Sequence, residues 1–270
     1  MTNKDNFMNW ENPGRALITG SSSGIGAEFA RQLASQGFDL ILVARRIEKL
    51  KALSIELKNK YSISAEVLVV DLSNLTDTEK LVSRILELED IDVLINNAGF
   101  GIMDTFLHID RMRHVDMINV HFTSPVMLCH ATLPGMIKRK RGVIINTSSV
   151  AALNKRHYSL GLMYTTTKSA ITIFSEILKD KIKGTGIYIQ ALCPGLTSTE
   201  FHDSETMHGY QRNSIQNELW MTPEEVVLLS LKNVKTKDVI FIAGETNLNM
   251  AKHYRKSSVN KYLNAKILLS

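Results

Sequence analysis

The sequence has few cysteines and no long apolar run. Cys129 and Cys193 are its only two cysteines, which excludes a disulfide framework and a cysteine-rich metal site and is typical of a reduced, cytoplasmic protein. The eight histidines show no metal-ligand spacing, so no metal site is predicted. No stretch reaches the ~18 apolar residues that span a bilayer, and the polar first residues lack a signal-peptide core. We therefore expect a cytoplasmic protein without a transmembrane segment.

The sequence also lacks a strong charge of one sign outside its C-terminal end. The net charge is +5, and residues 246–270 contain five basic side chains and no acidic one. Residues 1–245 therefore contain 27 basic and 27 acidic side chains. This balance is not that of a nucleic-acid-binding domain, so no nucleic-acid partner is predicted. We expect the basic C-terminal tail, 246–270, to be a solvated helix or a frayed end. The alternative is a weak contact with a membrane surface or a partner.

Apolar runs alternate regularly with helical patterns along the chain. Short Val/Ile/Leu-rich runs predict strands of a parallel sheet that helices cover on both faces. We therefore expect an α/β fold, a single-domain doubly wound (Rossmann) parallel sheet of about seven strands, over residues 1–270. The polar segment 197–222 is the predicted substrate flap. The expected strands are 16–18, 38–44, 65–70, 91–95, 142–146, 187–192 and 239–243, and the expected helices are 27–36, 47–60, 76–89, 108–121, 123–139 and 162–183.

Three glycines follow the first predicted strand. Gly20, Gly24 and Gly26 lie in the segment LITGSSSGIGAEFA, between that strand and the next helix. Glycines at this place permit a tight turn and a close approach of the backbone to a pyrophosphate at the helix N-terminus. The Lys-Ser/Thr pair of a P-loop does not follow the last glycine. The segment therefore predicts a dinucleotide site.

The residues after the second predicted strand indicate which dinucleotide is favoured. A carboxylate there binds the ribose hydroxyls of NAD, whereas a basic side chain accepts the 2′-phosphate of NADP. This chain has Ala44, Arg45 and Arg46 at that place. Guanidinium groups bind phosphate through paired hydrogen bonds, and arginines at a helix start are otherwise unfavourable for the helix dipole. We therefore predict NADP(H) as the cofactor.

Four motifs together resemble the short-chain dehydrogenase/reductase family in their order and spacing. They are TGSSSGIG at 19–26, NNAG at 96–99, YTTTK at 164–168 and PG at 194–195. The resemblance extends from about residue 14 to 243. The stretches ARRIEKL, LPGM and CPGLTSTEF look most like the NADP-preferring branch of broad-specificity bacterial carbonyl reductases.

The resemblance implies a set of cofactor-binding residues. The glycine turn would bind the pyrophosphate and the adenosine ribose, and Asp71 with Leu72 would face the adenine. Residues after the sixth strand would lie against the nicotinamide. The full predicted set is Gly20, Ser22, Ser23, Gly24, Ile25, Gly26, Arg45, Arg46, Asp71, Leu72, Asn97, Ala98, Gly99, Tyr164, Lys168, Pro194, Gly195, Thr197 and Thr199.

The resemblance also implies four catalytic residues, Asn119, Ser149, Tyr164 and Lys168. Tyr164 would be the general acid/base, Ser149 would hold the carbonyl oxygen, and Asn119 would hold a water of the proton relay. Lys168 lies one helical turn after Tyr164, where its ammonium would lower the phenol pKa from its usual ~10. Ser149 lies about two positions farther from Tyr164 than is usual in the family, which indicates an altered substrate-side loop.

These residues predict an NADP(H)-dependent oxidoreductase that transfers hydride between the nicotinamide and a small-molecule carbonyl or secondary alcohol substrate. One alternative is a 3-oxoacyl-thioester reductase acting on an acyl carrier protein or CoA. Another is a non-catalytic NADP-binding sensor or docking protein, although such a protein would not need all four catalytic residues. The resemblance also implies a homodimer or homotetramer, packed through the helices around 108–139 and 162–183.

Overall fold

The predicted doubly wound sheet is confirmed. A computed structural model of the chain describes residues 8, 10–153, 161–208, 210, 215–236 and 238–249. In these residues, seven parallel strands form one sheet in the order β3-β2-β1-β4-β5-β6-β7. The strands are β1 (Arg15–Thr19), β2 (Asp39–Ala44), β3 (Ala65–Val69), β4 (Ile91–Asn96), β5 (Gly142–Thr147), β6 (Ile187–Cys193) and β7 (Ile240–Ile242).

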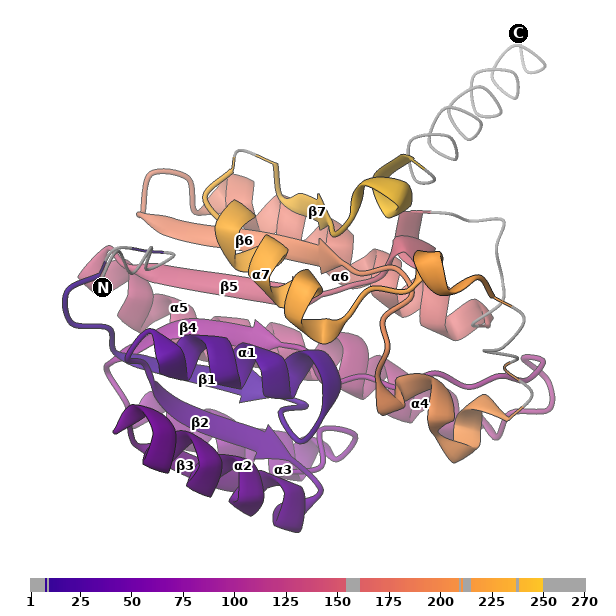
Figure 1. The fold of residues 1–270 in the computed structure, drawn as a ribbon, viewed down its shortest axis with the longest axis horizontal. Coiled ribbons are helices and arrows are strands. Elements are labelled where there is room, and N and C mark those ends of the chain that lie inside the picture. The colour runs from indigo at the N-terminus through magenta and orange to yellow at the C-terminus, as the bar shows by residue number, and fades with distance from the viewer. Residues whose placement is uncertain are drawn as a thin grey trace, which may run out of the picture.

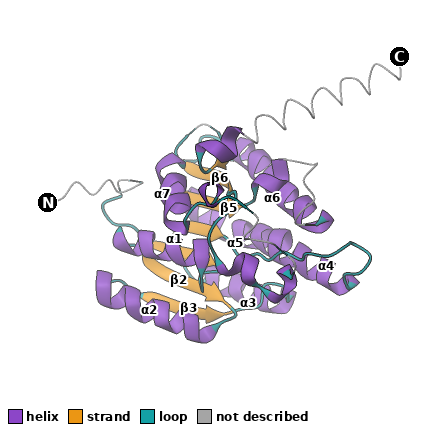
Figure 2. Cartoon of the chain, turned by 45° about the vertical axis from the view of Figure 1, so that its right-hand side comes forward, coloured by secondary structure: helices purple, strands orange, loops and turns teal. Residues whose placement is uncertain are grey.

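Helices cover both faces of this sheet, as Figures 1 and 2 show. One face packs against α1 (Gly24–Ser35), α2 (Ile47–Tyr61) and α7 (Pro223–Asn233), which lie toward the viewer in Figure 1. The other face packs against α3 (Leu75–Leu86), α5 (Ser124–Arg139) and α6 (Leu162–Lys181), and α4 (Arg111–Ile118) contacts α6. Because apolar side chains of the strands are buried on both faces, the strands read as continuous Val/Ile/Leu runs.

The strand order reverses between β1 and β4, which are hydrogen-bonded neighbours although two strands separate them in sequence. Chain connections leave such a point in opposite directions, so a crevice opens outside the carboxyl ends of the two strands. The glycine turn follows β1, and the NNAG motif covers the end of β4 and the residues after it. The fold thus brings both motifs to the crevice.

Two elements differ from the sequence predictions. The helices expected at 108–121 and 123–139 are joined without a break, because a π-helical stretch, η1 (Asn119–Thr123), connects α4 to α5. Helix α7 was not predicted, although Thr222 and Glu225 form a capping box at its start. Among the described residues, no helix is long and apolar enough to cross a membrane.

Several predicted segments lie partly outside the described residues. These are the tail at 246–270, of which 250–270 are not described, and the flap at 197–222, of which 209 and 211–214 are not described. Residues 154–160, between Ser149 and Tyr164, are also not described. The bounds of the flap and of the tail therefore stay predictions.

Candidate active site

One cleft of about 910 Å³ lies in the crevice at the carboxyl ends of the strands. This volume is within the usual range of ligand sites, about 300–1,000 Å³. All the predicted cofactor-binding residues line it except Gly26, and all the predicted catalytic residues line it except Asn119. The fold therefore brings predicted site residues from separate segments, the first at Gly20 and the last at Thr199, into one cleft.

The glycine turn is closely packed, and a side chain at any of its three glycines would collide with neighbouring atoms. Gly20 has a φ of +67°, and a Cβ there would lie 2.8 Å from the Cα of Ala98. A Cβ on Gly24 would lie 2.9 Å from Cγ2 of Thr199. A Cβ on Gly26 would lie 2.3 Å from the Gly20 carbonyl oxygen, so Gly26 closes the turn from behind and does not reach the cleft. The open face of the turn fits a pyrophosphate at the start of α1.

Thr19 connects the glycine turn to the NNAG motif. Its hydroxyl accepts hydrogen bonds from the backbone N–H groups of Asn97 (3.0 Å) and Ala98 (3.1 Å). The Asn97 side-chain amide in turn donates to the Thr19 carbonyl oxygen at 3.2 Å. These bonds fix the two cofactor-facing segments relative to each other across the point where the strand order reverses.

The two predicted phosphate-binding arginines have different surroundings. The Arg46 guanidinium donates to the Ser22 hydroxyl from Nε (3.1 Å) and Nη2 (2.8 Å), and to the Ser23 hydroxyl from Nη2 (2.6 Å). The Arg45 side chain is 68% exposed and lies 3.9 Å from an Asp71 carboxylate oxygen. Arg46 is thus held against the glycine turn, while Arg45 faces solvent at the edge of the cleft.

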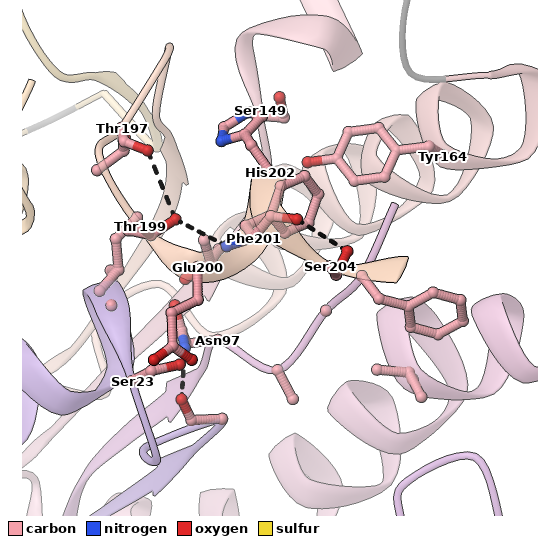
Figure 3. Close-up of a pocket in the computed structure, with 18 of the residues that line it drawn as sticks. Ser23, Asn97, Ser149, Tyr164, Thr197, Thr199, Glu200, Phe201, His202 and Ser204 are labelled. Carbon is pink, nitrogen blue, oxygen red and sulfur yellow. Dashed lines mark hydrogen bonds between the residues drawn. The ribbon is translucent and has the colours of Figure 1, made fainter. Parts of the chain in front are cut away.

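Ser149 is the serine that reaches Tyr164. Tyr164 is buried, and its hydroxyl points into the cleft on the side where Ser149 lies (Figure 3). The Ser148 hydroxyl instead donates to the Lys168 carbonyl oxygen at 2.8 Å and lies 2.6 Å from the Thr172 hydroxyl. Ser148 therefore ties β5 to α6, and its neighbour is the one directed toward Tyr164.

Lys168 lies behind Tyr164 on the same helix. Its ammonium donates to the Thr147 carbonyl oxygen at 2.8 Å and lies 5.8 Å from the centre of the Tyr164 ring. Burial lowers the pKa of Lys168 to about 8. Burial also raises the pKa of Tyr164 to about 12, an effect that the hydrogen bond with Ser149 opposes. The expected lowering of the Tyr164 pKa is therefore wrong for this structure, because burial of the phenol is the largest influence on that pKa and raises it.

Asn119 lies beside the cleft rather than in its wall. Its side-chain amide donates to the Ser73 carbonyl oxygen at 2.9 Å, and its own carbonyl oxygen accepts from the Ser124 N–H. These bonds hold the junction of α4 and α5 against the loop after β3. The predicted role of Asn119 in a proton relay stays a prediction.

His121 is a site residue that sequence reasoning missed. The side chain is buried, Nε2 accepts from the Phe100 N–H at 3.1 Å, and Nδ1 lies 2.9 Å from the Thr167 hydroxyl. The ring meets the Tyr164 ring edge-on at 5.6 Å. Burial, together with the charge of Lys168, holds the pKa of His121 well below its usual value. A neutral imidazole therefore packs beneath the tyrosine and the lysine.

The three threonines between Tyr164 and Lys168 have separate surroundings. The Thr167 hydroxyl donates to the backbone carbonyl oxygens of the preceding turn, 2.9 Å away at Met163 and 3.1 Å away at Tyr164, and it also faces His121. Thr165 is buried and Thr166 is exposed. Of the three, Thr167 thus connects the helix that carries Tyr164 to the residues below the cleft.

The flap contributes an aromatic wall opposite Tyr164. The Phe201 ring lies 5.9 Å from the Tyr164 ring and 5.1 Å from the His202 ring, which in turn lies 5.0 Å from the Trp220 ring. Thr199 begins this segment, since its hydroxyl accepts from the Phe201 N–H at 3.3 Å (Figure 3). In the part of the chain that the structure describes, no three His, Cys, Asp or Glu side chains are placed to hold a metal ion.

Comparisons with known proteins find many relatives of this chain. A family model for the short chain dehydrogenases matches residues 15–208. The NADP-dependent 3-hydroxy acid dehydrogenase of Schizosaccharomyces pombe is 33% identical over 233 residues, which are 84% of this chain and 89% of that protein. The human very-long-chain 3-oxoacyl-CoA reductase is 30% identical over 189 residues, which are 68% of this chain and 60% of that enzyme.

The chain spans only 56–60% of the length of several of its curated relatives, the human very-long-chain 3-oxoacyl-CoA reductase among them. Among solved structures, a short-chain dehydrogenase from Sphingobium yanoikuyae in complex with NADPH has a TM-score of 0.79 and 28% sequence identity. That similarity covers 92% of this chain and 95% of the other.

Proposed function

The chain belongs to the short-chain dehydrogenase/reductase family, and we propose that it is an NADP(H)-dependent oxidoreductase that interconverts a carbonyl compound and a secondary alcohol. The strongest support is that the Tyr164 and Ser149 hydroxyls and the Lys168 ammonium lie in the cleft that begins at the glycine turn. The NADP-dependent yeast relative and the NADPH-bound bacterial structure support the choice of cofactor. When bound, NADP(H) supplies or accepts the hydride.

The residues of the cleft fit each part of this cofactor. The open side of the glycine turn would hold the pyrophosphate, because its N–H groups and the start of α1 favour an anion. Arg46, with Ser22 and Ser23, would hold the 2′-phosphate through guanidinium and hydroxyl donors. Lys168, whose side chain lines the cleft, would hold the nicotinamide ribose.

Tyr164 would give a proton to the substrate oxygen during reduction. With a pKa of about 12, its hydroxyl is protonated at neutral pH, which is the form that this step requires. Ser149 would donate a second hydrogen bond to the same oxygen and stabilise the negative charge that develops there. Phe201 would exclude water from the other side.

Substitution of Tyr164 by phenylalanine tests this assignment. We expect Tyr164→Phe to lose turnover by about 10²- to 10⁴-fold, the usual contribution of a general acid. NADPH affinity, measured by fluorescence titration, should stay within about twofold of the unsubstituted chain, because no phosphate contact is removed. Tyr61→Phe, at the distant end of α2, is the matched control and should retain full turnover.

Two results would contradict the proposal in different ways. Full turnover by Tyr164→Phe would overturn the role of the tyrosine. NADPH binding by the unsubstituted chain without oxidation, over a panel of ketones, aldehydes and acetoacetyl thioesters, would favour a sensor. The same panel tests the thioester alternative, which the similarity to the human 3-oxoacyl-CoA reductase favours.

A further inference from the structure

Glu200 of the flap joins the side chains that would hold the 2′-phosphate. One carboxylate oxygen, Oε2, accepts from Arg46 Nη1 at 2.6 Å, and the other, Oε1, accepts from Lys49 Nζ at 2.5 Å. Figure 3 shows Glu200 extending from the flap toward Ser23 in the glycine turn. We call Ser22, Ser23, Arg46, Lys49 and Glu200 the Glu200 cluster. It joins three segments that are remote in sequence: the glycine turn, the first turn of α2 and the flap.

The guanidinium of Arg46 is already divided between neutral and charged partners in this cluster. Nε and Nη2 face the Ser22 and Ser23 hydroxyls, whereas Nη1 faces the Glu200 carboxylate. Hydrogen bonds from Lys49 and Arg46 hold the pKa of Glu200 at about 2, so its side chain is an anion at any physiological pH. The Nη1 group of Arg46, which faces the flap, is therefore already paired with the Glu200 carboxylate.

A carboxylate and a phosphate ester bind an arginine side chain in the same way. Both are planar or tetrahedral arrays of anionic oxygens that accept paired hydrogen bonds from guanidinium. A 2′-phosphate placed on Arg46, Ser22 and Ser23 would bring a second anion beside Glu200. Two anions that both contact one guanidinium group repel each other, so one of the two must give up its contact with Arg46.

We propose that Glu200 is a specificity-determining residue that competes with the 2′-phosphate of NADP(H) for Arg46 and Lys49, and this rests on the proposed function above. Glu200 thereby reduces the preference for NADP(H) over NAD(H) below the value that the basic residues alone would give. A cofactor without the 2′-phosphate leaves the Glu200 ion pairs intact, so its affinity does not depend on Glu200. The role belongs to a residue outside the sequence segment that normally sets cofactor preference.

Removal of the carboxylate should therefore tighten binding of only those ligands that carry the phosphate. The probes are adenosine 2′,5′-bisphosphate and 5′-AMP, which differ by the 2′-phosphate and contain no nicotinamide. Both are titrated by calorimetry into the full chain. Because the ion pairs of Glu200 are about half exposed, we expect Glu200→Gln to tighten the bisphosphate by roughly three- to tenfold and to leave 5′-AMP unchanged. Added salt should reduce the gain.

Glu48→Gln is the matched control, because it removes one negative charge from the first turn of α2 at a side chain that is 83% exposed, pairs with Lys51 and lies outside the cleft wall. It should change neither affinity by more than about twofold. Glu200→Ala is a second variant without a carboxylate and should reproduce Glu200→Gln. Bisphosphate affinity that is unchanged or weaker in both Glu200 variants, or an equal gain for both probes, would overturn the proposal.

A double-mutant cycle with Arg46→Ala tests the competition itself. If Glu200 acts through Arg46, most of the gain from Glu200→Gln should disappear once Arg46 is alanine, since no shared guanidinium remains. A gain that persists in full would assign the effect to general charge and overturn the competition. Failure of the proposed cofactor would differ: neither the unsubstituted chain nor any Glu200 variant would distinguish the two probes, and both proposals would fall.

Discussion

Burial sets the charge states of the side chains around the proposed reaction centre. Tyr164 and His121 are buried and favour their neutral forms, while burial lowers the pKa of Lys168 to about 8. Desolvation penalises the charged form of each group, so it raises the pKa of a phenol and lowers that of a base. Lys168 is therefore the one of these three whose charge changes just above neutral pH.

Titration of Lys168 should appear in cofactor binding. Its ammonium is present below a pKa of about 8 and is lost as the pH rises through that value. A polyanionic cofactor favours the charged lysine, so we expect NADPH affinity to fall above pH 8, by at most about tenfold per pH unit for one proton. Fluorescence titrations of NADPH between pH 6.5 and about 9.5 measure this.

Two variants assign the titration to its residue. Lys168→Met should bind NADPH more weakly and should lack the decline above pH 8. Tyr164→Phe should retain the decline, because the Tyr164 pKa of about 12 lies outside the measured range. A decline that disappears in Tyr164→Phe and persists in Lys168→Met would contradict the assignment.

Residue contacts within one helical turn could be predicted from the sequence, whereas distant contacts could not. Tyr164 and Lys168 lie four positions apart, so their common helical face follows from helix geometry. His121 meets Thr167 across 46 positions, and Arg46 meets Glu200 across 154. No local pattern specifies such partners, which depend on how η1 and the flap pack against the rest of the fold.

Helix α7 shows how an element with clear local signals was still missed. Its apolar side chains Val226 and Val227 are buried against the face that contains α1. Thr222 accepts from the Glu225 N–H at 3.2 Å, and the Glu225 carboxylate accepts from the Thr222 N–H at 2.8 Å. The capping box is visible in the sequence, but Thr222 is the last residue of the predicted polar flap, and no element is predicted between it and the strand at 239–243.

Removal of the cap should therefore destabilise the domain. Thr222→Ala leaves the Glu225 N–H at the start of α7 without its side-chain acceptor, and we expect the free energy of unfolding to fall by about 1 kcal/mol. Urea unfolding followed by circular dichroism measures this. Thr76→Ala, at an exposed position in the first turn of α3, is the control and should change it by less than about 0.5 kcal/mol. Equal losses in both variants would contradict a capping role.

The strands were the most predictable elements, and the junctions were the least. Continuous Val/Ile/Leu runs predict strands that are buried on both faces, and all seven expected strands are present in the sheet. The π-helical stretch between α4 and α5 was expected as an ordinary break between two helices. Within this stretch the Asn119 side-chain amide donates to the Ser73 carbonyl oxygen in the distant loop after β3, a contact that no local sequence pattern specifies.

At the scale of the whole molecule, α4 and α6 are among the described elements that leave apolar side chains exposed. Ile173 and Ile177 on α6 are each 55% exposed, and Val115 and Ile118 on α4 are 41% and 37% exposed. Helices α4 and α6 contact each other, so these residues belong to adjacent elements. Exposed apolar side chains on two helices that contact each other favour an interface between subunits at these helices.

The predicted homodimer or homotetramer should therefore depend on this face. We expect the unsubstituted chain to be oligomeric by size-exclusion chromatography with light scattering, and the double variant Ile173→Glu/Ile177→Glu to have a smaller mass, because charge at the centre of an apolar interface is costly. Ile55→Glu, at a 60% exposed position on α2 on the other face of the sheet, is the control and should keep the original mass. A monomeric unsubstituted chain, or an oligomer that tolerates both glutamates, would contradict packing through α6.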